Sequence, residues 1–179
     1  MFIKENTVLV LIDVQERLIP VIHEKEELVG NLQKLITGMK ILGVPIIWNE
    51  QYPKGLGATV PELSSLLTEQ TPVEKVCFSC CQNESFTKAL AESGRQQVIV
   101  CGIEAHICVY QTVMELKTKG YEVEVVADGV SSRQAYNKEI ALDKLRSNEV
   151  GLTSTEMILF ELIQVAQGDA FKKISRLVR

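Results

Sequence analysis

The sequence predicts an α/β protein in which a six-stranded, mostly parallel sheet lies between two layers of helices. Short apolar runs alternate with longer segments of helical periodicity along all 179 residues. A glycine separates a helical segment from the strand after it at Gly43, Gly94 and Gly120. This alternation is typical of parallel sheets with right-handed crossovers, a Rossmann-like three-layer arrangement. No linker or repeat interrupts it, so we expect one domain over residues 1–179.

The predicted strands are short apolar runs bounded by glycine, proline or polar residues. They cover residues 7–12, 44–48, 72–76, 97–101, 122–126 and 150–153. The first of these, TVLVLI, has no polar position after its opening threonine. Such continuous runs favour strands that are buried on both faces, as parallel sheets require.

The predicted helices are recognised from apolar residues spaced three and four apart and from their end signals. They cover residues 24–42, 62–67, 83–93, 106–119, 137–147, 156–166 and 169–178. Residues 127–132 are expected to form a loop. Residues 49–62 are rich in glycine and proline and are expected to form a binding loop or a lid that carries specificity.

Composition excludes several classes of function. The formal net charge is −4 and the pI is about 5.3, which argues against nucleic-acid binding. No apolar run approaches the roughly 20 residues that span a bilayer, so no membrane partner is expected. The first residues lack the features of a signal peptide, which predicts a cytoplasmic protein. Five cysteines, an odd number, are then expected to be free thiols.

Three reactive side chains follow predicted strands. Asp13 comes after the first strand, Lys75 lies near the end of the third, and Cys108 comes after the fourth, where a helix is expected to begin. Because parallel strands end at the same edge of a sheet, these side chains are expected to meet there. A helix N-terminus lowers the pKa of a thiol, which makes Cys108 a candidate nucleophile. Asp13 could accept its proton, and the Lys75 ammonium would favour both charged forms.

Four segments carry a family resemblance: LIDVQERL at 11–18, VEKVCFS at 73–79, CGIEAHICVYQT at 101–112 and VVADGVSSR at 125–133. Together they resemble the isochorismatase-like cysteine hydrolases, which include nicotinamidases and N-carbamoyl amidohydrolases. The segment NEQYPKGLGATVPEL at 49–63 is most similar to the small isochorismatase-domain proteins. The motifs appear in the family's order and spread over most of the chain.

The resemblance implies a mechanism. It assigns the catalytic triad to Asp13, Lys75 and Cys108, and a cis peptide bond to Ile103 and Glu104. The backbone amides of Glu104 and Cys108 would form an oxyanion hole. The implied reaction is attack of the Cys108 thiolate on a carbonyl carbon, release of ammonia or an amine, and hydrolysis of the thioester by water. A small amide, a carbamoyl compound or a related C–N compound is the expected substrate.

The family's nicotinamidases bind a metal through an Asp-x-His motif, and this chain departs from that pattern. Residues 48–52 read Trp-Asn-Glu-Gln-Tyr, and the two histidines are His23 and His106. Neither a metal nor another cofactor is therefore expected. The candidate residues of the substrate pocket are Gln15, Glu50, Gln51, Tyr52, Phe78, His106 and Tyr110.

Two alternatives and one assembly state are also considered. Cys77 and Cys80 form a C-x-x-C motif, directly followed by Cys81, which could serve a thiol redox enzyme. The chain could instead be a catalytically weak interaction protein that retains the fold. The apolar residues on the last two helices, together with the habit of the family, predict a homo-oligomer, a dimer or larger. Those apolar residues are Leu159, Ile163 and Phe171.

Overall fold

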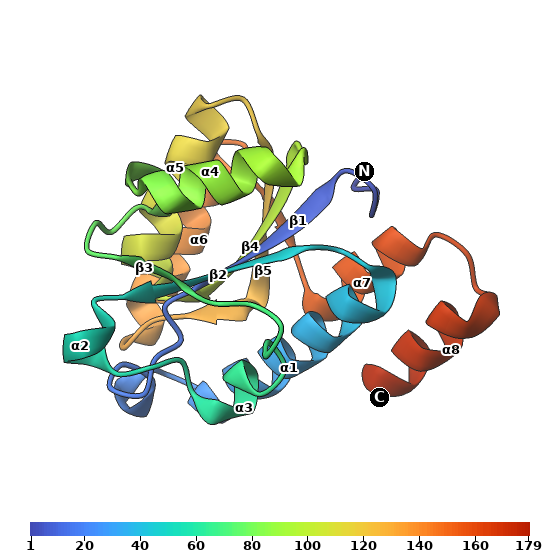
Figure 1. The fold of residues 1–179 in the computed structure, drawn as a ribbon, viewed down its shortest axis with the longest axis horizontal. Coiled ribbons are helices and arrows are strands. Elements are labelled where there is room, and N and C mark those ends of the chain that lie inside the picture. Colours follow the sequence, from blue (N-terminus) through green and yellow to red (C-terminus); the bar gives the residue numbers. More distant parts are fainter.

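Six strands, all parallel, form one sheet in the computed structural model, which describes residues 1–179 (Figure 1). The strand order is β3-β2-β1-β4-β5-β6, with parallel pairing throughout. Their bounds are β1 Thr7–Ile12, β2 Ile46–Gln51, β3 Val73–Lys75, β4 Gln97–Ile103, β5 Glu122–Ser131 and β6 Gly151–Thr153. Successive strands are added in one direction from β1 to β3 and in the opposite direction from β4 to β6. Open α/β folds place their sites at this switch point, between β1 and β4.

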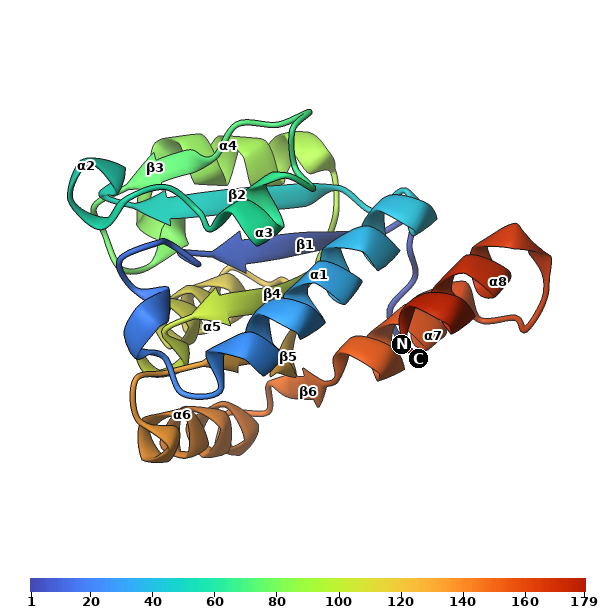
Figure 2. The same ribbon diagram turned by 90° about the horizontal axis from the view of Figure 1, so that it is seen from below.

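The helices cover both faces of this sheet, which confirms the predicted fold class. α1, α7 and α8 lie on one face, whereas α4, α5 and α6 lie on the other (Figure 2). The helices are α1 Lys25–Leu42, α2 Pro53–Leu56, α3 Pro61–Ser64, α4 Glu84–Ser93, α5 Tyr110–Thr118, α6 Ala135–Ser147, α7 Thr155–Ile163 and α8 Gly168–Leu177. None of them combines the length and the apolar character that crossing a bilayer requires.

Two apolar clusters, one on each face of the sheet, form the core. Alternation along β1 shows why, since Leu9 and Leu11 pack towards α1 while Val8, Val10 and Ile12 pack towards α5. Every residue of β1 is buried. Burial on both faces explains the unbroken apolar run in its sequence and holds the C-terminal end of the strand rigidly.

Strand β5 is longer than predicted, and residues 127–132 do not form the expected loop. β5 continues to Ser131 because its register with β4 shifts between Val100 and Gly102, after which Ile103 pairs with Ser131. The polar residue that suggested a loop, Asp128, accepts hydrogen bonds from the backbone and the hydroxyl of Thr155 at the start of α7. Strand β2 likewise extends to Gln51, into the segment that was expected to be a loop.

The last two helices bury apolar residues that the sequence suggested were on the surface. Leu159 is fully buried, and it packs so closely on α1 that a Cβ on Gly38 would collide with its side chain. Phe160 and Phe171 stack between α7 and α8 with ring centroids 6.4 Å apart. The exposed apolar side chain on α7 is instead Met157. The use of Leu159 as evidence for an oligomer interface is therefore wrong.

Candidate active site

Asp13, Lys75 and Cys108 lie together at the C-terminal edge of the sheet. Asp13 directly follows β1, Lys75 is the last residue of β3, and Cys108 lies in the turn after β4. The residues are 1%, 2% and 7% exposed, respectively. Three chemically reactive groups are thus withdrawn almost completely from water.

The backbone of Asp13 leaves the strand sharply. Its φ of 54° lies in the left-handed region, which aspartate tolerates better than most residues. The Asp13 N–H donates to the carbonyl of Asn49 at 3.1 Å, and the Asp13 carbonyl accepts from the N–H of Gln15 at 2.8 Å. These bonds fix the direction in which the carboxylate leaves the sheet.

The Lys75 ammonium is surrounded by acceptors. Its Nζ donates to Asp13 Oδ2 at 2.7 Å and to Gln51 Oε1 at 2.6 Å, and the carbonyls of Cys77 and Phe78 lie at 3.3 Å. An ammonium has three protons, so four acceptors engage it fully. Lys75 therefore acts through its charge on Asp13 and does not offer a free donor to a ligand.

Cys108 lies in a widened helical turn, Ala105–Val109, where the sequence predicted the start of a regular helix. The N–H of Val109 donates to the carbonyl of Glu104 at 3.3 Å, five residues back, and α5 begins only at Tyr110. Such π-type turns are frequent at functional sites. The peptide bond between Ile103 and Glu104 is cis, and the N–H of Glu104 donates to no acceptor in the chain.

Gly102 lets this turn sit directly against the end of β1. Its φ is 112°, and a Cβ built there would lie 2.1 Å from the carbonyl oxygen of Ile12. No side chain fits in that space, because the obstacle is backbone. The nucleophile turn and Asp13 are thereby held at a fixed separation.

The electrostatics differ from those expected at a helix start. Burial raises the pKa of the Cys108 thiol to about 12, and the negative charge of Asp13 adds to this, whereas Lys75 opposes it. The expectation of a lowered pKa is therefore wrong, since desolvation is the largest effect on this thiol. Burial also raises the pKa of Asp13, against the pull of Lys75. Burial alone would lower the pKa of Lys75, but the Asp13 charge raises it. The resting site is a neutral thiol beside a buried ion pair.

One oxygen of this ion pair is free. Asp13 Oδ1 is buried and accepts no hydrogen bond of regular geometry, while Oδ2 is bonded to Lys75. The negative charge of the Asp13 carboxylate acts on the Cys108 thiol and raises its pKa. The neighbouring Asn49, which donates to the Leu11 carbonyl, also has a buried oxygen without a partner. The arrangement can therefore take up a proton at Asp13.

Gln15 and Glu50, which were expected to line the pocket, are buried. Gln15 Nε2 donates to the carbonyls of Gln51 and Gly57, at 2.9 and 2.7 Å. Glu50 Oε1 accepts from the backbone and the hydroxyl of Thr59, at 2.7 and 2.8 Å. Both side chains hold the segment after β2 in place. The sequence could not show whether these polar side chains support the backbone or contact the substrate.

The other candidate residues are more exposed than Gln15 and Glu50. Tyr52 and Phe78 are 54% and 55% exposed and flank Lys75. His106 is half-buried, with Nδ1 2.9 Å from the hydroxyl of Ser132. Tyr110, also half-buried, lies under the ammonium of Lys144, 4.6 Å from the ring centroid. Only the two exposed aromatic side chains are free of such partners.

A contact that the sequence did not predict joins the cis turn to the end of β5. Glu104 Oε2 accepts from the backbone N–H of Arg133 at 2.9 Å and from its Nε at 3.2 Å. Arg133 is the last residue of the motif VVADGVSSR. The position of Arg133 after a predicted strand was the one feature of the sequence that could have indicated a role at the site. The pair braces the turn that carries Cys108.

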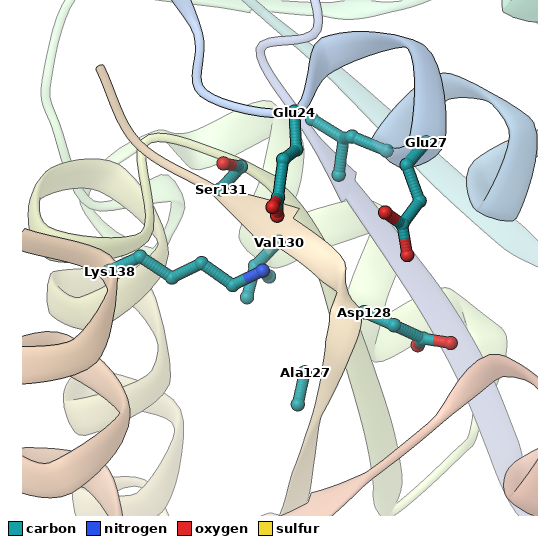
Figure 3. Close-up of a pocket in the computed structure, with 8 residues that line it drawn as sticks. Glu24, Glu27, Ala127, Asp128, Val130, Ser131 and Lys138 are labelled. Atoms are coloured by element: carbon teal, nitrogen blue, oxygen red, sulfur yellow. The ribbon is translucent and has the colours of Figure 1, made fainter. Parts of the chain in front are cut away.

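One cavity lies apart from this site, and no metal-ligand cluster competes with it. A cavity of about 280 Å³ lies between the start of α1 and β5, lined by Glu24, Glu27, Asp128 and Lys138 among others (Figure 3). Asp13, Lys75 and Cys108 do not line this cavity. The Asp128 carboxylate accepts a hydrogen bond from the backbone N–H of Thr155 at the start of α7. No three His, Cys, Asp or Glu side chains are grouped so that they could hold a metal ion. The polar side chains of Asn49 and Gln51 are already engaged, since Asn49 donates to the Leu11 carbonyl and Gln51 accepts from Lys75.

The C-x-x-C motif is divided between two environments. Cys80 is fully buried and Cys77 is half-buried, and all five cysteines are free. Burial raises the pKa of Cys80 far above its usual range. A redox dithiol needs an accessible cysteine with thiolate character, and Cys80 is the opposite.

Comparison with known proteins identifies the family. The family model described as "Isochorismatase domain" matches residues 7–157. "Isochorismatase domain-containing protein 2" of Danio rerio is 42% identical over 175 residues, which are 97% of this chain and 87% of that protein. The chain therefore belongs to the isochorismatase family, as its motifs suggested.

Solved structures agree with this fold. The structure of "MAR1 Ribonuclease from Caenorhabditis elegans" is 36% identical, has a TM-score of 0.92, and covers 99% of this chain and 91% of that one. The Escherichia coli YcaC gene product, described as an octameric hydrolase of unknown specificity, has a TM-score of 0.93 at 21% identity and covers 98% of this chain and 89% of its own. The second likeness concerns the fold alone.

Proposed function

We propose that the chain is a metal-independent cysteine hydrolase that cleaves a small amide, carbamoyl or related C–N compound. The observation that carries the proposal is the buried Cys108 thiol at the same sheet edge as an Asp13–Lys75 ion pair whose second carboxylate oxygen is free. A buried nucleophile and a base at the same edge of the sheet, with a third group orienting the base, form the arrangement of covalent catalysis. Histidine has no part in it.

The reaction begins with proton transfer. Asp13 accepts the thiol proton as Cys108 Sγ attacks the carbonyl carbon, so the thiolate forms only during the attack. The carbonyl π electrons move onto oxygen and give a tetrahedral intermediate. Asp13 returns the proton to the leaving nitrogen, the C–N bond breaks, and ammonia or an amine departs. Water then hydrolyses the thioester, with Asp13 again accepting and returning a proton.

The turn at Glu104 supplies the groups that would stabilise the oxyanion. Its free N–H, together with the N–H of Cys108 at the start of a helix, would donate to the developing negative charge. In hydrolases, removal of one such donor costs about 3 kcal/mol. The Glu104–Arg133 contact supports this role, because it restrains the turn that carries both amides.

A small, uncharged substrate suits the site. Lys75 is fully engaged by protein acceptors, so its ammonium is not offered to a substrate carboxylate. The exposed side chains that flank it, Tyr52, Val76 and Phe78, are mainly apolar. These features favour a neutral amide with a modest apolar part.

RNA cleavage is the second candidate, because a structure 36% identical to this chain is named a ribonuclease. A net charge of −4 disfavours phosphate-backbone binding, which needs clustered lysine and arginine. The proposal therefore keeps RNA as a comparison substrate and not as the first choice.

The direct test is a screen of primary amides, secondary amides and carbamoyl compounds, with released ammonia or amine as the readout and single-stranded RNA in parallel. Cys108→Ala is the inactive variant and Cys77→Ala the matched control. Turnover of an amide that Cys108→Ala loses and Cys77→Ala retains supports the proposal. Two results would overturn the proposal. One is RNA cleavage that persists in Cys108→Ala, and the other is amide turnover that persists in this variant.

Assembly and location remain proposals. A homo-oligomer is proposed from the habit of the family and from exposed apolar residues such as Met157 and Val165, and light scattering after size exclusion tests it. A monomer at micromolar concentration would contradict it. A cytoplasmic location is proposed because all five cysteines are free, which suits a reducing compartment, and fractionation of the source cells tests it.

A further inference from the structure

We propose that Gln51 is a positioning residue that fixes the Lys75 ammonium against Asp13, and that Gln15 in turn fixes Gln51. The inference rests on the proposed function, since it concerns the same ion pair. It changes the role of both glutamines from substrate contacts to supports of the catalytic charges.

Both ends of the Gln51 amide are engaged. Oε1 accepts from Lys75 Nζ at 2.6 Å, slightly shorter than the 2.7 Å bond from Nζ to Asp13. Nε2 donates to the carbonyl of Val76 at 2.7 Å. The amide thus spans from the ammonium to the backbone just after β3, and rotation about its own axis would break both bonds.

Gln15 holds Gln51 from the opposite side. Its Oε1 accepts from the Gln51 backbone N–H at 2.7 Å, and its Nε2 donates to the Gln51 carbonyl at 2.9 Å. Gln15 itself is completely buried and also bonds to the Gly57 carbonyl. This side chain continues the hydrogen-bonding pattern of the sheet beyond the end of β1, so the position of Gln51 is set by the strand that also ends at Asp13.

A neutral acceptor suits this position. The titratable groups that face Lys75 are Asp13 from β1, Cys80 from the turn after β3, and Cys108 from the turn after β4, while Glu50 on β2 acts on Asp13. Of the groups that face it, Asp13 alone is a carboxylate. An amide oxygen stabilises the ammonium without competing with Asp13 for its charge, whereas a second carboxylate would compete.

The inference gives opposite expectations for two variants. In Gln51→Leu, the ammonium loses an acceptor, so the pKa of Lys75 falls and that of Asp13 rises. The pH range of activity then narrows from both sides. In Gln51→Glu, an acceptor remains and a negative charge is added, so the pKa values of Asp13 and Lys75 both rise. The whole range then moves towards alkaline pH.

The experiment measures the pH dependence of kcat/KM and, separately, of the alkylation of Cys108 by iodoacetamide. We expect kcat to fall on the order of 10- to 100-fold in Gln51→Leu with little change in KM, since misplacement of a catalytic group has effects of this size. Gln33→Leu is the matched control, because Gln33 loses one bond to a backbone carbonyl, that of Glu62 on α3. If Gln51→Leu does not fold, Gln51→Glu alone carries the test.

A purely structural role for Gln51 would lower melting temperature and activity without moving either limb of the profile, and that result overturns the inference. So does a Gln51→Glu profile that matches the wild type. Alkylation needs no substrate, so the two proposals can fail separately. If Asp13→Asn leaves the wild-type alkylation profile unchanged, the proposed function fails. If Asp13→Asn changes it and Gln51→Leu does not, only this inference fails.

Discussion

Lys75 and Val76 are neighbours in the chain, yet they belong to regions of opposite character. The Lys75 side chain is completely buried among oxygens, whereas Val76 is 78% exposed. The same boundary separates Asp13 and Cys108 from Tyr52 and Phe78. We call the first region the charge site, Asp13, Lys75 and Cys108, and the second the rim, Tyr52, Val76 and Phe78.

The difference between these regions is one of constraint. The carboxylate and ammonium of the charge site are bonded to each other, and its backbone is fixed by neighbouring strands. The rim side chains are more than half exposed. Chemistry should therefore depend on the charge site, and selection among substrates on the rim.

Cys108→Ala should have the largest effect. Removal of the nucleophile is expected to lower kcat by at least about 1,000-fold, as in other enzymes with covalent intermediates. Ammonia release from the substrate found in the screen measures it. Folding should be preserved, since a small apolar residue suits a buried position.

Breaking the ion pair should affect both activity and stability. Lys75→Met leaves the Asp13 carboxylate buried without its partner, which is expected to cost about 3–5 kcal/mol of unfolding free energy. Asp13→Asn combined with Lys75→Met removes both charges and should recover most of this stability without recovering activity. Urea unfolding of the two single variants and the double variant provides the measurement. Recovery of activity in the double variant would contradict the role of the charges.

Gly102→Ala should disturb the charge site through the backbone. With φ at 112° and the Ile12 carbonyl oxygen 2.1 Å from the new Cβ, we expect a loss of about 2–5 kcal/mol and a loss of activity. Gly94 is the matched control, because its φ is 65° and nothing lies within 4 Å of its Cβ position. Gly94→Ala should cost only about 1–2 kcal/mol, with activity retained. Thermal melts and kinetics compare the two, and equal effects would refute the close-contact argument.

Rim substitutions should have the smallest effects and should act on KM. Phe78→Ala and Tyr52→Ala are expected to change stability by no more than about 0.5 kcal/mol, since both side chains are exposed. Loss of apolar contact with substrate should raise KM about tenfold, with kcat unchanged. A fall in kcat at constant KM would mean that Phe78 and Tyr52 take part in the chemical step, and would contradict the division between the charge site and the rim.

The sequence predicted the parallel α/β fold because alternating apolar runs and amphipathic segments are local signals. The extension of β5 was missed because it depends on a register shift against β4, which is a property of two strands together. The meeting of Asp13 with Lys75 followed from strand polarity. The pairing of Gln51 with Lys75 did not, since no periodicity indicates which neighbouring side chain accepts a hydrogen bond from the ammonium.

The pKa of Cys108 shows the same limit. A cysteine at a helix start suggested a lowered pKa, but the buried environment raises it to about 12. Burial depends on everything packed around the turn, including Asp13 and the end of β1. The consequence is mechanistic, because a neutral resting thiol needs its base at the moment of attack.

The most direct test of this account is the pH dependence of Cys108 alkylation, followed by mass spectrometry, in the wild type and in Asp13→Asn. The account predicts that the wild-type rate rises as Asp13 ionises, at a pH above the usual aspartate range, because burial raises the pKa of that carboxyl. In Asp13→Asn this rise should disappear, and alkylation should increase only as the thiol itself ionises. Identical profiles for the two proteins would contradict the claim that Asp13 activates Cys108.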